Sequence, residues 1–398
     1  MGIKGLSKFL KENVQSLRRE FPLSAFEDEI IGVDIYLWLH ANKAVATKEI
    51  TNQTNVMIEE ANEFDIFKTL IRNFIAFLKK LLMKRITPLI VFDGEPLLEK
   101  ESTREERRAE RAKAKERIDK IKEKIAEDIL SVPAELIIEL RKLLNNYVFL
   151  KDNEVKQIKE LLATIGIPFL QAKHDAEFLC SMLCREGIIK GVYSKDTDNI
   201  ALGCPVTITD ISNHSGELTV TVYEYHKIMF DLRAKYGEII TDSFFLEFCI
   251  MCGCDFNRNI YKVGPGTAMK LLLKHKTIDE IKRNTSHDIS CLKHVRCKEI
   301  FSPVSSKSLI VGEERYQVKK PNFKNFDESF RFRDLLEKYD VSDTNIERLV
   351  EFYDIIEKKR KEINEKREIN NKMADCNTDG KKEDTGGKKK ITIIIKKQ

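Results

Sequence analysis

Seven acidic side chains of this sequence stand where a divalent cation would find oxygen ligands, several of them at the end of an apolar run. The seven are Asp34, Asp93, Asp175, Glu177, Asp196, Asp198 and Asp255. A carboxylate that follows a buried strand costs desolvation free energy unless a cation or hydrogen bonds compensate it. A metal site is the simplest single explanation, although an acid in a loop commonly caps the next helix instead.

Two pairs among these acids carry more weight than the single acids do. Asp196 and Asp198 are two residues apart, as are Asp175 and Glu177. On a strand or its exit turn this spacing points both side chains to one face. On a helix, residues two apart diverge, so Asp175 and Glu177 act as a pair only at a helix start.

The acids need a scaffold that brings them to one edge, and the apolar runs of the sequence provide it. Residues 30–34, 88–94 and 191–198 are typical of short buried parallel strands, each closing on acid. Apolar residues recur at helical spacing over 64–83 and 155–165. We therefore expect an α/β fold with a mixed, mostly parallel sheet flanked by helices. In open sheets of this kind, ligands bind at the carboxyl ends of the strands.

Short segments around the acids match those of a known family. They are Met1-Gly2-Ile3-Lys4-Gly5-Leu6, Val33-Asp34 with Trp38-Leu39-His40, Val91-Phe92-Asp93-Gly94-Glu95-Pro96, His174-Asp175-Ala176-Glu177, Ser194-Lys195-Asp196-Thr197-Asp198, Gly253-Cys254-Asp255-Phe256 and Val263-Gly264-Pro265-Gly266-Thr267-Ala268. Each segment alone is weak evidence for a family, but all of them together, in this order, are highly specific evidence. Over residues 1–285 the chain resembles the flap endonuclease and XPG family of structure-specific nucleases.

The resemblance implies a PIN-like sheet with a helical arch and a helix-two-turn-helix element that binds DNA. It divides the chain into a nuclease core at 1–285, a helical carboxyl-terminal extension at 286–356 and a charged, disordered tail at 357–398. Within the core it implies an amino-terminal block at 1–96, the arch at 97–150 and an internal block at 151–285, with the helix-two-turn-helix at 255–276.

The resemblance also implies two bound Mg²⁺ ions, with Mn²⁺ as a substitute. One ion would be held by Asp34, Asp93 and Glu177 with Asp175, and the second by Asp196, Asp198 and Asp255. Mg²⁺ prefers hard oxygen ligands, which fits these residue types. The family usually has Glu-x-Glu where this chain has Asp175-Ala176-Glu177. The shorter side chain of Asp175 favours a water-mediated role.

The stretch from Glu99 to Asp128 is almost wholly charged and matches the arch of the family. By resemblance, Lys100 and Arg107 would contact the scissile phosphate, and their spacing of seven puts both on one helix face. Arg104 and Arg108 are further candidates for DNA contact. For most of the stretch the alternative is a solvated helix laced with ion pairs, because acids are interspersed with the bases.

A second group of candidate DNA contacts lies around the Gly-Pro-Gly turn. Glycines let a backbone approach a phosphate closely, and a helix beginning near Thr267 would offer free N–H groups. The candidates are Gly264, Gly266, Thr267, Lys270 and Lys274, together with Gly2, because in the family the amino terminus folds towards the active site. Taken alone, the turn would be an ordinary loop.

Bulk properties indicate a soluble intracellular protein. Lys and Arg number 69 against 64 acids, a net charge of +5, so local clusters say more about nucleic-acid binding than the total does. No apolar segment is long enough for a membrane, and the start is not a signal peptide. We expect a nuclear or cytosolic location, with the nucleus favoured because the carboxyl-terminal region is rich in lysine.

The nine cysteines favour reduced thiols. Cys249, Cys252 and Cys254 raise the question of zinc, but no second pair follows at finger spacing, and residues 244–251 are typical of a buried helix. We expect no zinc site.

Three functions stay open. The first is a Mg²⁺-dependent endonuclease that cuts branched DNA with a 5′ single strand, in replication or repair. The second is a 5′-to-3′ exonuclease or Holliday-junction resolvase with the same chemistry. The third is a catalytically silent DNA-binding scaffold, which has no need to hold seven acids together. We expect a monomer, and we find no sliding-clamp binding box.

Overall fold

A seven-stranded sheet forms the centre of the computed structural model, which describes residues 2–15, 17–129, 132–214, 216–302 and 339. The strands lie in the order β1-β7-β6-β5-β2-β3-β4. They are β1 (Arg19–Pro22), β2 (Ile30–Asp34), β3 (Thr87–Phe92), β4 (Phe169–Gln171), β5 (Gly191–Tyr193), β6 (Val206–His214) and β7 (Glu217–Glu224). Neighbours from β4 to β6 run parallel, whereas β7 is antiparallel to both β6 and β1. The predicted mixed, mostly parallel sheet is confirmed.

The strand β3 shows why the sheet is covered on both faces. All six of its residues are buried. Successive side chains point to opposite faces: Ile90 and Phe92 belong to the core that contains α3 (Glu63–Leu82), and Leu89 and Val91 to the core that contains α7 (Ala176–Arg185). Burial of each such side chain contributes roughly 1.5–3 kcal/mol.

The predicted helices at 64–83 and 155–165 are confirmed by α3 and by α6 (Asp152–Thr164). Two further helices next to the sheet are α2 (Ile35–Gln53) and the single turn α8 (Asp198–Ala201). The strand predicted at 191–198 ends earlier, at Tyr193. The Ser194 hydroxyl oxygen accepts a hydrogen bond from the backbone N–H of Asp196 (3.1 Å), so the chain turns before the acids.

A second core lies below the sheet and is built almost entirely of helices. Its helices are α1 (Leu6–Asn13), α9 (Tyr225–Tyr236), α10 (Asp242–Cys252), α11 (Pro265–His275), α12 (Ile278–Asn284) and α13 (His294–Phe301). The buried helix predicted at 244–251 is α10. It carries Cys249 and Cys252, which are buried in this apolar core.

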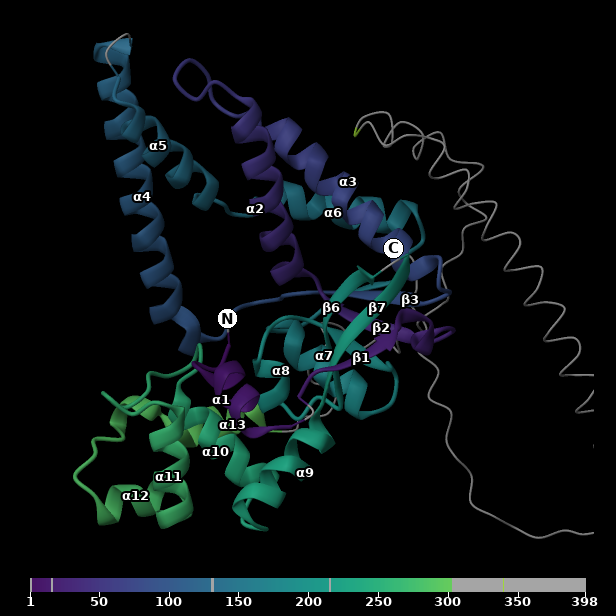
Figure 1. Cartoon of the computed structure of the whole chain (residues 1–398), viewed down its shortest axis with the longest axis vertical. Coiled ribbons are helices and arrows are strands. Elements are labelled where there is room, and N and C mark those ends of the chain that lie inside the picture. Colours follow the sequence, from purple (N-terminus) through teal and green to yellow (C-terminus); the bar gives the residue numbers. More distant parts are fainter. Residues whose placement is uncertain (1, 16, 130–131, 215, 303–338, 340–398) are drawn as a thin grey trace, which may run out of the picture.

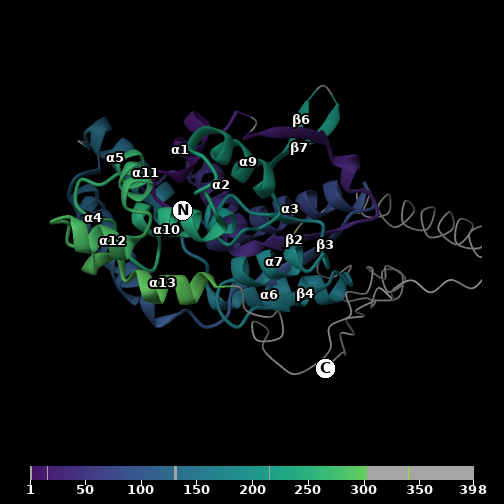
Figure 2. The same ribbon diagram turned by 90° about the horizontal axis from the view of Figure 1, so that it is seen from below.

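Two helices stand away from the sheet, α4 (Glu101–Glu127) and α5 (Ala134–Asn146) (Figure 1). They pack on each other through a small apolar cluster that includes Ile118, Ile121 and Leu140. An ion pair between Arg117 and Glu139 (2.8 Å) also joins them. Figure 2 shows α4, α5, α11 and α12 at one end of the molecule, with the sheet towards the other.

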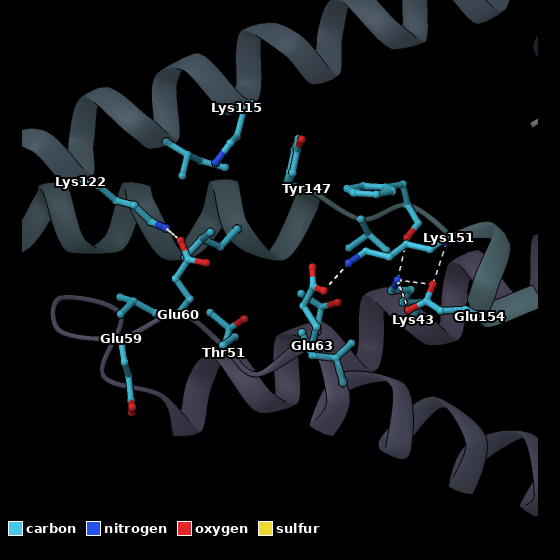
Figure 3. Close-up of a pocket in the computed structure, with 18 residues that line it drawn as sticks. Lys43, Thr51, Glu59, Glu60, Glu63, Lys115, Lys122, Tyr147, Lys151 and Glu154 are labelled. Atoms are coloured by element: carbon cyan, nitrogen blue, oxygen red, sulfur yellow. Dashed lines mark hydrogen bonds and ion pairs between the residues drawn. The ribbon is translucent and has the colours of Figure 1, made fainter. Parts of the chain in front are cut away.

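A cavity of about 210 Å³ is lined by residues of α4, of α2 and of the segments that follow α2 and α5 (Figure 3). At one end the buried Lys43 ammonium lies 2.7 Å from both carboxylate oxygens of Glu154 and donates to the carbonyl of Phe149 (2.7 Å). Ion pairs of Lys122 with Glu60 and of Lys151 with Glu63 bridge the cavity as well. These contacts tie α4 and the exit of α5 to the core.

The part of the predicted extension beyond residue 302, apart from Tyr339, and the tail at 357–398 lie outside the described residues. Among the helices of the described part, none is long and apolar enough to span a bilayer.

Candidate active site

The ends of parallel strands and the starts of helices bring all seven predicted acids together. Asp34 ends β2, Asp93 directly follows β3, and Asp175 is the residue before α7, with Glu177 in its first turn. The other three are Asp196 and Asp198 after β5 and Asp255 after α10. Six of the seven line one cleft of about 810 Å³. The seventh, Asp198, is buried beside two of them.

The tightest group of carboxylates in the described residues consists of Glu177, Asp196 and Asp198. One oxygen from each lies within 4.8 Å of the other two. The division expected by resemblance places Glu177 with Asp34 and Asp93 instead. That division stays a prediction, whereas the geometry puts Glu177 close to Asp196 and Asp198, which the division assigns to the other ion.

Local hydrogen bonds hold the acids in place. The Ser194 hydroxyl donates to Oδ2 of Asp34 (3.2 Å), and the backbone N–H of Asp198 donates to Oδ1 of Asp196 (3.0 Å). Oδ1 of Asp93 accepts from the backbone N–H of Ala176 (2.7 Å), which fixes the start of α7 to the end of β3. The acids therefore come from separate segments of the chain, and hydrogen bonds to the acids join these segments.

Burial and mutual repulsion raise the pKa values of five carboxyl groups, those of Asp34, Asp93, Glu177, Asp196 and Asp198. Burial, together with the charges of Asp93 and Asp196, raises the pKa of Asp34 to about 8. The pKa of Asp93 is raised to about 6, again chiefly by burial. Burial is also the largest cause that raises the pKa of Glu177 and of Asp198. Without a cation, the cluster therefore retains protons at pH values where isolated carboxyl groups are ionised.

The residues present fit a divalent cation. Oε1 of Glu177 and Oδ1 of Asp198 are buried and accept no hydrogen bond from any residue that the structure describes. Buried polar atoms are normally satisfied, so such orphaned oxygens call for a missing partner. The donor set is entirely carboxylate, which is the chemistry that Mg²⁺ prefers.

Lys100 reaches into the acids from the foot of α4. It ends a short 3₁₀ turn, Leu98–Lys100, and its ammonium lies 2.9 Å from Oδ2 of Asp175 and 3.8 Å from Oε1 of Glu177. Burial alone would lower the pKa of Lys100, but the charges of Glu177 and Asp175 outweigh it and raise the pKa. The ammonium also lies 5.0 Å above the ring of Phe256.

Arg107 approaches the cluster two turns further along α4, with Nη2 3.3 Å from Oδ2 of Asp255. Arg104 and Arg108 line the same cleft, but both pair with Glu101, at 3.1 and 3.4 Å. Further out the helix carries local ion pairs, such as Lys115 with Asp119 and Lys120 with Glu116. The outer part of α4 is therefore a solvated helix with local ion pairs. Lys100 and Arg107, the two residues predicted to be catalytic, contact acids of the cluster.

Tyr36 and His40 are among the cleft residues to which the sequence reasoning gave no role. They lie one helical turn apart at the start of α2, directly after Asp34. Burial, with the nearby charges of Lys43, Arg111 and Arg107, lowers the pKa of His40, so its imidazole is neutral at pH 7. The signal in the sequence was the spacing of four that follows an acid at a strand end.

The residues of the Gly-Pro-Gly turn lie apart from the cleft. Gly264 caps α11, which begins at Pro265, two residues before the expected start. Gly264, Gly266, Thr267, Lys270 and Lys274 are all exposed and none lines the cleft. A Cβ added at Gly264 or Gly266 would meet no atom within 4 Å. Packing within the protein does not require glycine at either position.

Gly2 lies against the acids themselves. Its φ is +85°, and a Cβ there would lie 2.0 Å from Oδ1 of Asp196. The next residues are held by backbone hydrogen bonds: the N–H of Ile3 donates to Oγ1 of Thr197 and the N–H of Lys4 to the carbonyl of Gly253, both at 2.9 Å. The beginning of the chain is thus part of the wall of the site.

Family models match two separate parts of the chain. The XPG N-terminal domain matches residues 1–114 and the XPG I-region matches residues 166–255, together about half of the sequence. The first match contains Asp34, Asp93, Lys100 and Arg107, and the second ends on Asp255 after taking in the other four acids.

Curated relatives agree with the family models. Flap endonuclease 1 of Cryptosporidium muris is 27% identical over 315 residues, which are 76% of this chain and 62% of that protein. The enzyme of the same name from Cryptosporidium parvum is 28% identical over 71% of this chain and 56% of its own length. The chain thus spans less than two thirds of these two relatives. A probable RAD2-like endonuclease of Invertebrate iridescent virus 6 is 26% identical over 78% of this chain and 81% of its own.

Solved structures share the fold at low identity. The catalytic core of Rad2 in complex with DNA substrate superposes with a TM-score of 0.56 at 16% identity, covering 87% of this chain and 100% of that one. Human GEN1 in complex with Holliday junction DNA gives a TM-score of 0.53 at 17% identity, covering 89% and 79%.

Proposed function

The chain belongs to the XPG family, and on this premise we propose that it is a Mg²⁺-dependent, structure-specific DNA endonuclease that cleaves 5′ flaps where single strand meets duplex. The observation that carries the proposal is the cleft in which six of the seven carboxylates face Lys100 and Arg107. A site of this kind combines ligands for hard cations with positive groups for a phosphate. We further propose a role in DNA replication or repair.

Divalent cations, when bound, supply the activated water and the stabilisation of the leaving oxygen that phosphodiester hydrolysis needs. The proposed ligands are Asp34, Asp93, Asp175, Glu177, Asp196, Asp198 and Asp255, with Mn²⁺ as the expected substitute for Mg²⁺. The raised pKa values of Asp34, Glu177 and Asp198 support this assignment, because positive charge at the site would relieve their mutual repulsion.

Lys100 and Arg107 would orient the scissile phosphate and offset the negative charge that develops on it. Fixed cations aimed at developing charge are among the strongest contributions to catalysis. Both side chains contact Asp255, at 3.9 and 3.3 Å, so they already lie at the edge of the acidic cluster where that phosphate would arrive.

The exposed turn before α11 would hold the duplex. Gly264 and Gly266 leave the backbone open to close approach, and Lys270 and Lys274 add positive charge on the same helix. Contacts of this type position a duplex without reading its sequence. The cleft and the turn would then bind the two sides of a junction.

A second candidate, a 5′-to-3′ exonuclease or Holliday-junction resolvase with the same chemistry, is favoured by Tyr36 and His40. These cleft residues lie in the segment 34–40, which by resemblance looks more like the other branches of the family than like the typical flap endonuclease. A silent scaffold is disfavoured, because such a protein has no use for buried acids that repel one another.

The test is single-turnover cleavage in Mg²⁺ of a labelled 5′ flap, beside matched bubble, nicked and four-way-junction DNAs. The Asp198→Asn protein controls for contaminating nucleases. We expect fast cutting at the base of the flap that depends on Asp198. Preference for another substrate would reassign the activity within the family, and binding without cutting would favour the scaffold.

A further inference from the structure

A hollow of about 420 Å³ adjoins the acidic cluster beside α1. Its wall includes Ser7 and Lys11 of α1, Arg18 and Lys195. It also includes Asp196, which lines the cleft beneath α4 as well. The two depressions are therefore lined by one shared carboxylate of the proposed metal site, Asp196.

The exposed face of α1 and the turn before it is basic. Lys4, Lys8 and Lys11 are exposed, and their spacing of four and three residues puts them on one helix face. The opposite face is buried through Leu6 and Leu10 in the helical core. Packing explains the apolar face of α1 but gives no reason for three lysines on the other.

The cations of this region differ from those of α4 in their partners. In the described part of the chain, neither Lys8, Lys11 nor Arg18 forms an ion pair, whereas α4 is laced with them. Tyr223 and the charge of Asp210 raise the pKa of Arg18, so its guanidinium stays positively charged. Lys195 is partly offset by Asp210, at 3.7 Å. Arg18 is influenced by Asp210 but forms no ion pair with it, and Lys11 forms none in the described residues, so both cations can bind an anion from outside.

We propose that Lys11, Arg18 and Lys195, with the Ser7 hydroxyl, form a second phosphate-binding surface that holds the DNA backbone where it leaves the acidic cluster on the side away from α4. The inference rests on the proposed function and adds to it a substrate path. Lysine and arginine bind phosphates largely by releasing counterions, so the surface contributes affinity and position but no sequence preference.

The experiment compares binding of a 5′-flap DNA by fluorescence anisotropy, with EDTA present to prevent cleavage, over a series of salt concentrations. The variant is Lys11→Gln with Arg18→Gln. We expect an affinity about 3- to 10-fold lower and a log–log salt slope smaller in magnitude by about two. Each single variant should reduce that slope by about one. Both side chains are exposed, so a thermal melt should show an unchanged fold.

The matched control is Lys156→Gln with Lys235→Gln, which removes the same charge from exposed positions on α6 and α9 that line neither the cleft nor the hollow. An equal loss of affinity in the control would overturn the inference, because the effect would then be one of net charge. An unchanged salt slope in the Lys11 and Arg18 variants would overturn it too. Failure of the unsubstituted protein to bind flap DNA would instead overturn the proposed function.

Hydroxyl-radical footprinting of the same complexes adds position. The Lys11 and Arg18 variant should lose protection of the backbone on one side of the cleavage position and keep the protection that α11 provides. A loss of protection that is spread evenly over the whole DNA would contradict a phosphate-binding surface beside α1.

Discussion

The ammonium of Lys100 lies 2.9 Å from Oδ2 of Asp175 and belongs to the turn from which α4 rises. The start of α4 is thus fixed to the acidic cluster by the positive charge of Lys100. A divalent cation bound by the same acids would carry charge of the same sign. Lys100 and a divalent cation are attracted by the same carboxylates, and each weakens the binding of the other.

Replacing Lys100 by alanine should therefore strengthen cation binding in the absence of DNA. We expect Lys100→Ala to bind Mn²⁺ about tenfold more tightly, equivalent to about 1.4 kcal/mol. Electron paramagnetic resonance of free Mn²⁺ measures this without any nuclease assay. Arg104→Ala is the control, since Arg104 pairs with Glu101 and no acid of the cluster. Weaker or equal Mn²⁺ binding by Lys100→Ala would contradict the competition.

Asp198→Asn should abolish cleavage and spare duplex binding. The substitution removes a charge from the Glu177–Asp196–Asp198 group and leaves the exposed turn before α11 untouched. Loss of a metal ligand should lower the single-turnover rate by at least about 10³-fold. Rate and affinity measured on the same flap DNA separate the two effects. A variant that still cuts at a comparable rate would remove Asp198 from the ligands.

The stability of the protein in EDTA should fall as the pH rises from 6 to 8. In the folded protein the pKa of Asp34 is about 8, whereas an unfolded aspartate titrates near 3.9. Between these values the folded state holds a proton that the unfolded state has lost, so raising the pH favours unfolding. We expect a Tm roughly 2–5 °C higher at pH 6 than at pH 8.

Two controls isolate this effect. Mg²⁺ should raise the Tm more at pH 8 than at pH 6, because the acids are then ionised. Asp34→Asn should flatten the pH dependence. If the Tm in EDTA rises between pH 6 and 8, in the unsubstituted protein or in Asp34→Asn, then groups other than Asp34 determine the pH dependence of stability.

Gly266→Ala tests the duplex contact without disturbing the fold. A Cβ at Gly266 meets no neighbour, and alanine is the better residue in the first turn of a helix by roughly 0.5–1 kcal/mol. The Tm should therefore stay the same or rise slightly, while affinity for duplex DNA falls by about 3- to 10-fold because the methyl group keeps a phosphate at a distance. Unchanged affinity would place the duplex elsewhere.

An extension at the amino terminus should impair the enzyme. Gly2 fits against Asp196 with no room for a Cβ, and the backbone of Ile3 is tied to Thr197 between two acids of the cluster. Residues added before Gly2 must find space beside these contacts or displace them. Cleavage by one preparation before and after removal of an amino-terminal tag measures the effect, with a carboxyl-terminal tag as control. Equal activity before and after removal of the tag would show that added residues do not disturb the site.

Much of the fold could be predicted because its signals are local. The apolar runs that end at Asp34 and Asp93 are strands because they alternate between two covered faces, and α3 shows its helical period plainly. The acids could be placed at one edge by topology alone, since parallel strands present their carboxyl ends together.

The remaining features depend on segments far apart in the chain. Nothing local indicates that Lys43 is buried against Glu154, because a lysine in a helix is usually solvated. The position of Glu177 beside Asp196 and Asp198 depends on how α7 meets the turn after β5. The basic face of α1 is visible as a pattern, but the hollow beside it forms only where Lys11, Arg18 and Lys195 converge.

The backbone bonds of Ile3 and Lys4 have a consequence for biosynthesis. These residues emerge from the ribosome first, yet their partners are Thr197 and Gly253, and Asp255 follows later still. A translation product that stops before Gly253 contains most of the carboxylates but lacks Asp255 and the carbonyl that holds Lys4. Unfinished chains of this length are therefore made without the complete acidic cluster, which closes only when the segment around Gly253 and Asp255 has been synthesised.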